Sequence, residues 1–202
     1  RLQYLAYREL KATVAAHNAA AGSVVVLDVE TGEVLAMVNQ PSFNPNLRVK
    51  LRDGRYRNRA VTDMFEPGSV MKTFSVLSAL QHDQVTPTTL VDTSPGWMTV
   101  GGNIVKEDKN KNFGLIDVAS ILQKSSNVGI SKLTLAQPAE CLWDTYTRLG
   151  FGMSTGSGFP GESAGTLMKP SKYGSFVLVT QAFGYALTAT PLQLAQAYAV
   201  LG

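Results

Sequence analysis

The sequence has 202 residues, which fits one domain or part of a larger protein. Hydrophobic residues make up 45% of it and charged residues 16%, a composition that can fill a packed core and excludes an intrinsically disordered chain. The net charge of +3 gives no support to a nucleic-acid partner. Cys141 is the only cysteine and has no Cys or His cluster around it, so we expect no disulfide, no metal and no cofactor.

The first 60 residues predict a helix, a hairpin and a loop. Apolar residues recur at helical spacing over residues 1–18. Two apolar runs, 23–29 and 34–38, flank a Gly-containing turn and predict a β-hairpin. Because both runs are apolar on both faces, we expect the sheet to be covered on both sides. Residues 39–60 predict a loop, whose basic run from Arg48 to Arg59 favours a solvated surface over an anion site.

The remaining residues predict mainly helices, with no internal repeat and no linker between domains. After a break at Glu66-Pro67-Gly68, we expect a helix from Ser69 to about Leu80 and a polar, turn-rich stretch over 84–114. Further helices are expected at 116–123, 128–135 and 138–149, followed by a Gly-rich stretch over 150–165. Thr190 and Pro191 supply a cap and a first-turn proline for a helix that runs to Gly202.

Ser69 and Lys72 are a candidate nucleophile and base. Side chains three residues apart lie near each other on a helix surface. The helix is apolar on nearly every side, so Lys72 enters apolar surroundings, where desolvation and the nearby helix N-terminus both lower the pKa of an amine. A neutral lysine can take the proton of a serine hydroxyl, which is otherwise inert. The free backbone N–H of Ser69 would supply half of an oxyanion hole.

The same two residues also have a purely structural interpretation, in which Ser69 caps the helix and the amine of Lys72 reaches solvent. With 15 serines and 10 lysines in the chain, chance gives about 0.7 Ser-x-x-Lys matches. The pattern alone therefore favours the structural interpretation.

Ser125-Ser126-Asn127 is a second candidate constellation, in a short break between two apolar helices. A hydroxyl and an amide two residues apart could pass a proton and hold both a lysine and a substrate carbonyl. The alternative is that these residues only cap the helix that follows.

The two motifs in this order resemble class B penicillin-binding proteins. The resemblance covers nearly the whole chain, and Glu66-Pro67-Gly68 resembles the division-specific branch, penicillin-binding protein 3. The matching segments are Leu27 to Met37 (opening hairpin), Arg57 to Asp63 and Phe65 to Lys72 (first motif), Gln123 to Gly129 (second motif), and Phe183-Gly184-Tyr185 with Thr190 to Ala195 (the run before the third motif).

The resemblance implies an α+β fold of the serine β-lactamase-like transpeptidase type, with several helices and an antiparallel sheet, incomplete at its C-terminus. It implies a D,D-transpeptidase in which Ser69 attacks the D-Ala-D-Ala carbonyl of a peptidoglycan stem peptide, and in which β-lactams acylate the same serine. Lys72 would be the base, Ser125 the proton relay and Asn127 the amide that orients Lys72 and substrate. Ser126, Gly184 and Tyr185 would contact substrate.

The resemblance also implies a setting for the protein. Divisome membrane proteins would be its partners, and it would act at the periplasmic face of the inner membrane. The sequence contains no apolar stretch of membrane-spanning length and no signal peptide, so we expect an anchor outside this chain.

The sequence departs from the family in two places. The third motif, Lys-Thr/Ser-Gly, does not occur in the 202 residues, so we expect residues 1–202 to be the N-terminal two-thirds of a transpeptidase domain that alone lacks full acylation competence. Ala186 stands where the family usually has glycine.

Other functions fit the sequence less well. A β-lactam sensor or a class D β-lactamase-like domain also uses Ser-x-x-Lys, but the second motif and Thr190-Pro191-Leu192-Gln193 favour the transpeptidase. The G-x-G-x-x-G match at Gly156 contains a proline and follows no strand, which argues against dinucleotide binding. His17 and His82 fall at predicted helix ends, which argues against a Ser-His-Asp triad.

Overall fold

The computed structural model describes residues 1–46, 54–82, 85–172 and 174–202, so the basic residues Arg48, Lys50 and Arg52 lie outside the described residues. The chain divides into two compact units that interleave along the sequence. Unit 1 comprises Arg1–Phe65, Leu149–Gly165 and Ala189–Gly202, and unit 2 comprises Glu66–Arg148 and Thr166–Thr188. The sequence analysis did not anticipate this division, although three of its four boundaries lie beside the Glu66-Pro67-Gly68 break or the Gly-rich stretch over 150–165.

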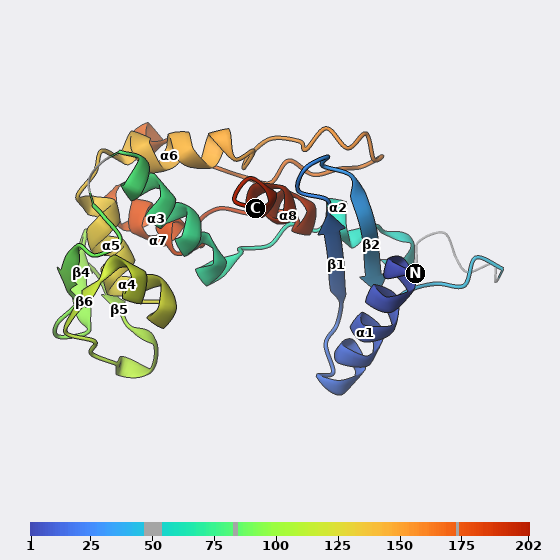
Figure 1. Cartoon of the computed structure of the whole chain (residues 1–202), viewed down its shortest axis with the longest axis horizontal. Helices are drawn as coiled ribbons and strands as arrows, with labels where there is room; N and C mark the ends of the chain where they lie inside the picture. Colours follow the sequence, from blue (N-terminus) through green and yellow to red (C-terminus); the bar gives the residue numbers. More distant parts are fainter. Residues whose placement is uncertain (47–53, 83–84, 173) are drawn as a thin grey trace. The chain divides into compact units, whose positions relative to one another are not determined.

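Unit 1 is built around an antiparallel hairpin, β1 (Gly22–Leu27) and β2 (Val34–Gln40), with Gly22 opposite Gln40 and Val26 opposite Ala36. Three α-helices surround it: α1 (Leu2–Ala16), α2 (Arg59–Thr62) and α8 (Pro191–Ala199) (Figure 1). A 3₁₀ turn, η1, spans Gly54–Tyr56.

Helices cover both faces of this hairpin. A Cβ added at Gly22 would meet Leu10 and Val14 of α1, at 2.9 and 3.1 Å. The next residue, Ser23, lines a pocket with Pro191 and Leu194 of α8. Successive residues of a strand point to opposite faces, so α1 and α8 lie on opposite sides of β1. This confirms the expectation from the apolar character of both strands.

Unit 2 is a group of helices with two short sheets. Its helical segments are η2 (Gly68–Met71), α3 (Lys72–Gln81), η3 (Asp108–Asn110), α4 (Val118–Lys124), α5 (Asn127–Leu135), α6 (Ala139–Arg148), η4 (Pro170–Lys172) and α7 (Ser175–Ala182). Its strands are β3 (Leu90–Asp92), which pairs with β6 (Leu115–Asp117), and β4 (Trp97–Val100), which pairs with β5 (Asn103–Lys106). In the described ranges, no helix is both long and apolar enough to cross a lipid bilayer.

The β4–β5 hairpin packs on α7 through an apolar cluster. Val100 and Val105 of the hairpin and Val179 of α7 are buried together, with Phe176 and Phe183 against them. This packing holds the end of β5 beside the start of α5, where the Asn127 side-chain amide donates to the Lys106 carbonyl at 2.9 Å.

Most of the predicted helices are confirmed, and the differences have local causes. The predicted helix at Ser69 starts with a 3₁₀ turn, and the α-helix begins only at Lys72. The stretch 84–114 contains three strands of three or four residues, which are too short to show a period-two pattern. Helix α7 was missed, and α8 ends at Ala199 rather than Gly202.

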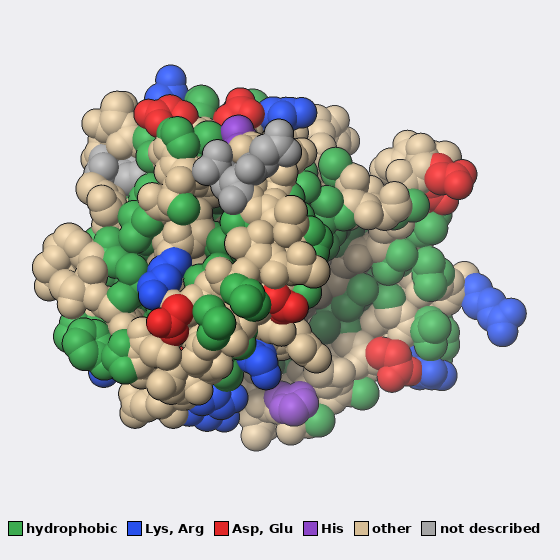
Figure 2. Space-filling view, turned by 60° about the vertical axis from the view of Figure 1, so that its left-hand side comes forward, with side chains coloured by type: hydrophobic (Ala, Val, Ile, Leu, Met, Phe, Trp, Pro, Cys, Tyr) green, Lys and Arg blue, Asp and Glu red, His purple; other side chains and the backbone are tan. Residues whose placement is uncertain are grey.

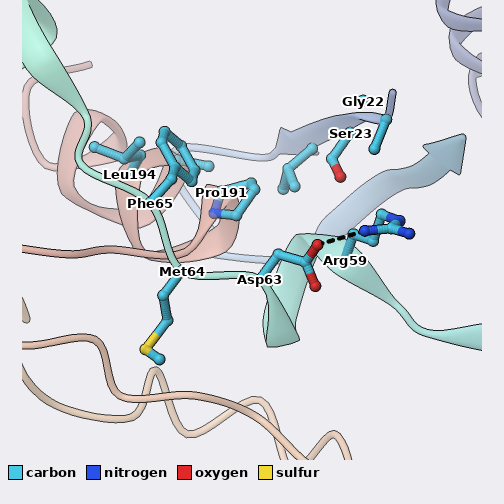
Figure 3. Close-up of a pocket in the computed structure, with 11 residues that line it drawn as sticks. Gly22, Ser23, Arg59, Asp63, Met64, Phe65, Pro191 and Leu194 are labelled. Atoms are coloured by element: carbon cyan, nitrogen blue, oxygen red, sulfur yellow. Dashed lines mark hydrogen bonds and ion pairs between the residues drawn. The ribbon is translucent and has the colours of Figure 1, made fainter. Parts of the chain in front are cut away.

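A pocket of about 600 Å³ lies in unit 1 between β1, α2 and α8 (Figure 3). An ion pair between Arg59 and Asp63, with 2.7 Å between Nη1 and Oδ2, lies at its wall. Burial acts to raise the pKa of Asp63, but hydrogen bonds from Arg59, Arg57 and Thr62 outweigh it and hold this pKa below its usual value. None of the candidate catalytic residues lines this pocket.

Charged side chains on the face in Figure 2 are interspersed, with Lys and Arg close to Asp and Glu. On that face the described residues do not form the basic patch typical of a nucleic-acid surface.

Helix α8 is capped as the sequence predicts. Gln193 N–H donates to the Thr190 hydroxyl at 3.2 Å, and Thr190 N–H donates to the Gln193 side chain at 2.9 Å. The Gln193 amide also donates to the carbonyls of Met153 and Ala164, both at 2.7 Å. The cap therefore ties the Gly-rich segment to α8.

We predict that Thr190→Val lowers the free energy of unfolding by about 1–2 kcal/mol, because it keeps the shape and removes the cap. Thermal unfolding of the full-length protein and hydrogen exchange of residues 191–199 would measure this. Thr190→Ser, which keeps the hydroxyl, is the matched control, and equal losses in the two variants would contradict the capping role.

Candidate active site

Ser69 lies on an exposed 3₁₀ turn before α3. Gly68 has a φ of +67°, which reverses the chain just before the serine. The Gly68 N–H donates to the Gly184 carbonyl at 2.9 Å. The turn that presents Ser69 is therefore fixed by a segment more than a hundred residues further along the chain.

Gly184 can only be glycine in this arrangement. Its φ is +90°, and a Cβ built on it would lie 1.9 Å from the Gly68 carbonyl oxygen. Two residues later, Ala186 has a φ of +54°, the left-handed region that glycine adopts without strain. The Ala186 N–H donates to the Glu66 carboxylate at 3.0 Å, which helps to hold this conformation. The departure from glycine at position 186 thus leaves the local geometry in place.

Lys72 is the first residue of α3, and its side chain is only 2% exposed. Its Nζ donates three hydrogen bonds: to the Ser125 carbonyl at 2.6 Å, the Ser125 hydroxyl at 3.0 Å and Asn127 Oδ1 at 2.7 Å. Burial lowers the pKa of this amine to about 8, against the opposing charges of Glu107 and Asp108. The direction predicted from the sequence is confirmed.

The second motif joins two helices by a single strained residue. Asp117 caps α4, which ends at Ser125 in the left-handed conformation, φ 55° and ψ 45°. Ser126 then caps α5 by accepting the Gly129 N–H at 2.8 Å. This sharp turn directs the side chains of Ser125 and Asn127 to the amine of Lys72, while that of Ser126 points into the protein.

A buried carboxylate, that of Glu107, accepts hydrogen bonds from the second motif and from the residue after it. It is 3% exposed and accepts the Ser126 hydroxyl, the Asn127 N–H at 2.7 Å and the Val128 N–H at 3.3 Å. The sequence analysis did not select Glu107 as a site residue. Its partners are about 20 residues away in sequence, so no local pattern could have revealed them.

These residues line a polar pocket of about 310 Å³ in unit 2. Its walls combine hydroxyl, amide, cationic and aromatic groups, from Ser69, Glu107, Asp108, Lys111, Phe113, Lys124, Ser125, Asn127, Phe183 and Tyr185. Lys111 and Lys124 both lie over the ring of Phe113, at 5.9 and 5.6 Å from its centroid. In the described part of the chain, no hydrogen bond joins the Ser69 hydroxyl to Lys72 Nζ.

The structure brings together most of the residues selected from the sequence. Ser69, Ser125, Asn127 and Tyr185 line one pocket, and Lys72 is bonded to two of them. Ser126 is fully buried and does not line this pocket, so the substrate contact predicted for it stays a prediction. Gly184 supports the Ser69 turn through its backbone and does not line the pocket.

The charged groups of the site do not form a metal centre. Across the described ranges, no three His, Cys, Asp or Glu side chains come close enough to hold a metal ion.

Comparison with known proteins identifies the family. Residues 22–202 match the penicillin binding protein transpeptidase domain. The chain belongs to this transpeptidase family. Peptidoglycan D,D-transpeptidase FtsI of Escherichia coli K12 is 44% identical over 202 residues, which are all of this chain and 34% of FtsI. Probable peptidoglycan D,D-transpeptidase PenA of Neisseria flavescens is 46% identical over 201 residues, 49% of its length.

Solved structures of transpeptidase domains share the fold. The apo transpeptidase domain of Burkholderia pseudomallei penicillin-binding protein 3 superposes with a TM-score of 0.88 at 40% identity, covering 98% of this chain and 55% of that one. The α+β fold and the penicillin-binding protein 3 type resemblance are confirmed. The chain spans about a third to a half of the length of these curated transpeptidase relatives.

We predict that Gly184→Ala destabilises the fold by at least about 2 kcal/mol more than Gly102→Ala, measured by thermal unfolding of the full-length protein. Both glycines have positive φ, +90° and +81°, but a Cβ at Gly102 meets no atom within 4 Å. The control variant therefore carries the backbone strain alone, about 1 kcal/mol. Equal losses would show that the contact with Gly68 is not tight.

Proposed function

We propose that this chain is part of a serine D,D-transpeptidase that cross-links peptidoglycan stem peptides during septal wall synthesis. One observation carries the proposal: the buried amine of Lys72 is hydrogen-bonded to Ser125 and Asn127, which line the same pocket as Ser69. The D,D-transpeptidase names of the FtsI and PenA relatives support it. The substrate would be a stem peptide ending in D-Ala-D-Ala, and β-lactams would acylate the same serine.

Acylation requires that Ser69 lose a proton as its oxygen attacks the penultimate D-Ala carbonyl. The neutral amine of Lys72 takes that proton, and the Ser125 hydroxyl, 3.0 Å from Nζ, can pass a proton to the leaving nitrogen. The peptide C–N bond breaks, D-alanine leaves, and an ester to Ser69 remains. An amine of a neighbouring stem then attacks the ester and regenerates the serine.

The environment of Lys72 suits this role. Its pKa of about 8 leaves about a tenth of the amine neutral at pH 7, whereas an unperturbed lysine would be almost wholly charged. Asn127 Oδ1 and the Ser125 carbonyl hold Nζ in place, so one proton can come and go without movement of the side chain. Apo enzymes often show long nucleophile–base distances that shorten when substrate binds.

Some of the machinery is proposed to lie outside these residues. The Lys-Thr/Ser-Gly motif is absent from the 202 residues, and the chain covers 34% of FtsI. We propose that residues 1–202 form the N-terminal two-thirds of the transpeptidase domain. The second oxyanion donor and the group that binds the substrate carboxylate would come from the third motif. From the resemblance to division-specific penicillin-binding proteins, we also propose that the protein acts at the periplasmic face of the inner membrane with divisome membrane proteins.

Mass spectrometry of the full-length protein after incubation with a penicillin tests the function. We predict one adduct, which maps to Ser69 and disappears in Ser69→Ala, because Ser69 is exposed on its turn, lines the pocket and lies three residues before the base proposed here, Lys72. Ser171→Ala, which changes an exposed serine outside the pocket, is the control and should label normally.

An adduct on Ser125, or no adduct, would overturn the proposal. Rapid release of hydrolysed penicillin would instead favour a β-lactamase. A transpeptidase holds the acyl group long enough for it to be isolated.

We predict that the rate constant for acylation of Ser69 rises with pH through a midpoint of about 8, as Lys72 loses its proton. Lys72→Ala should lower the rate by about a hundredfold or more at every pH, since general-base catalysis contributes about 10²–10⁴. Lys172→Ala, which changes an exposed lysine outside the pocket, should leave the profile unchanged. Normal labelling of Lys72→Ala would contradict the assignment of the base.

A further inference from the structure

Glu107 binds the N-terminus of α5 through both carboxylate oxygens. Oε1 accepts the Ser126 hydroxyl and the Val128 N–H, and Oε2 accepts the Asn127 N–H. A buried carboxylate without partners would be costly, and these donors and the positive end of the helix stabilise it. In turn, the carboxylate fixes the main chain of the residue whose side chain meets Lys72.

The side chain of Asn127 is held from the same segment. Its Nδ2 donates to the carbonyl of Lys106, the residue before Glu107, at 2.9 Å. This bond determines the orientation of the amide, so that Oδ1 faces Lys72 Nζ at 2.7 Å. The Lys106–Glu107 pair therefore controls both the position of Asn127 and the direction of its oxygen.

Glu107 also acts on Lys72 through its charge. Its negative charge favours the ammonium form of the amine, as does that of Asp108, while burial opposes it. The other charged or titratable groups at the pocket are Lys111, Lys124 and Tyr185. From α6, Tyr146 contacts α3 through a 2.9 Å hydrogen bond with Ser75.

We propose that Glu107 is a positioning residue of the acylation step. It holds Ser125-Ser126-Asn127 against the amine of Lys72, and its negative charge helps to set the pH at which that amine loses its proton. The proposal rests on the transpeptidase function proposed above. It goes beyond a capping role, because a cap alone would affect the stability of α5 and not the charge state of Lys72.

The test is the pH profile of Ser69 acylation in the full-length protein, measured with a fluorescent penicillin from pH 6 to 10. In Glu107→Gln we expect the high-pH plateau to fall about tenfold, because hydrogen bonds to the α5 N-terminus are lost. We also expect the midpoint to move to lower pH, because a negative charge that stabilised the ammonium form is gone.

Two further variants separate charge from geometry. Glu107→Asp keeps the charge and shortens the reach, so the plateau should fall while the midpoint stays near that of the wild type. Glu140→Gln makes the same chemical change at an exposed position outside the pocket and should change neither.

Each outcome decides the matter. A wild-type plateau and midpoint in Glu107→Gln, or a lower plateau with an unmoved midpoint, would overturn the proposal and leave the transpeptidase function standing. If Glu107→Gln does not fold, a wild-type plateau in Glu107→Asp would overturn it equally. Absence of Ser69 labelling in the wild type would instead remove the transpeptidase function, and the Glu107 proposal with it.

Discussion

The burial of one amine organises unit 2. Lys72 is only 2% exposed, although its amine is usually charged and burial of a charge is costly. Three oxygens of the second motif accept hydrogen bonds from this amine and offset that cost. Those oxygens are in place because the chain makes a left-handed turn at Ser125 between two capped helices. The buried carboxylate of Glu107 then holds the second of these helices at its start. The buried amine, the left-handed turn at Ser125 and the buried carboxylate of Glu107 each cost free energy, and the hydrogen bonds that link them offset this cost.

The proposed nucleophile, Ser69, has a different requirement, since it must stay accessible while its proposed base, Lys72, is buried. The chain meets both conditions within four residues, because a 3₁₀ turn presents Ser69 to solvent and α3 begins at Lys72. Contact between Gly68 and Gly184 fixes that turn from outside the helix. The structure therefore combines an exposed hydroxyl with a desolvated amine, the combination that the proposed activation of Ser69 needs.

Sequence reasoning recovered the features that depend on local patterns. The amphipathic first helix, the apolar hairpin and the Thr190 cap all follow from periodicity or capping rules, and the structure confirms them. The direction of the pKa shift of Lys72 followed from its position near the start of an apolar helix. The features that were missed depend on contacts between distant segments. Glu107 meets α5 only because the β4–β5 hairpin packs on α7, and the short strands of that hairpin carry no clear alternation. The motif alone did not distinguish Ser126, which caps α5, from Ser125 and Asn127, which bond the amine of Lys72.

The contact between Gly68 and Gly184 bears on when the site can form. During synthesis, Ser69 leaves the ribosome long before Gly184 exists, so its turn lacks its fixing partner for the next hundred residues of translation. In unit 1, one face of the β1–β2 hairpin likewise stays uncovered until α8 has been synthesised. Loop closures of this length are slow compared with helix formation. The helices can therefore form early, and the turn that carries Ser69 is fixed only after residue 184 has been made.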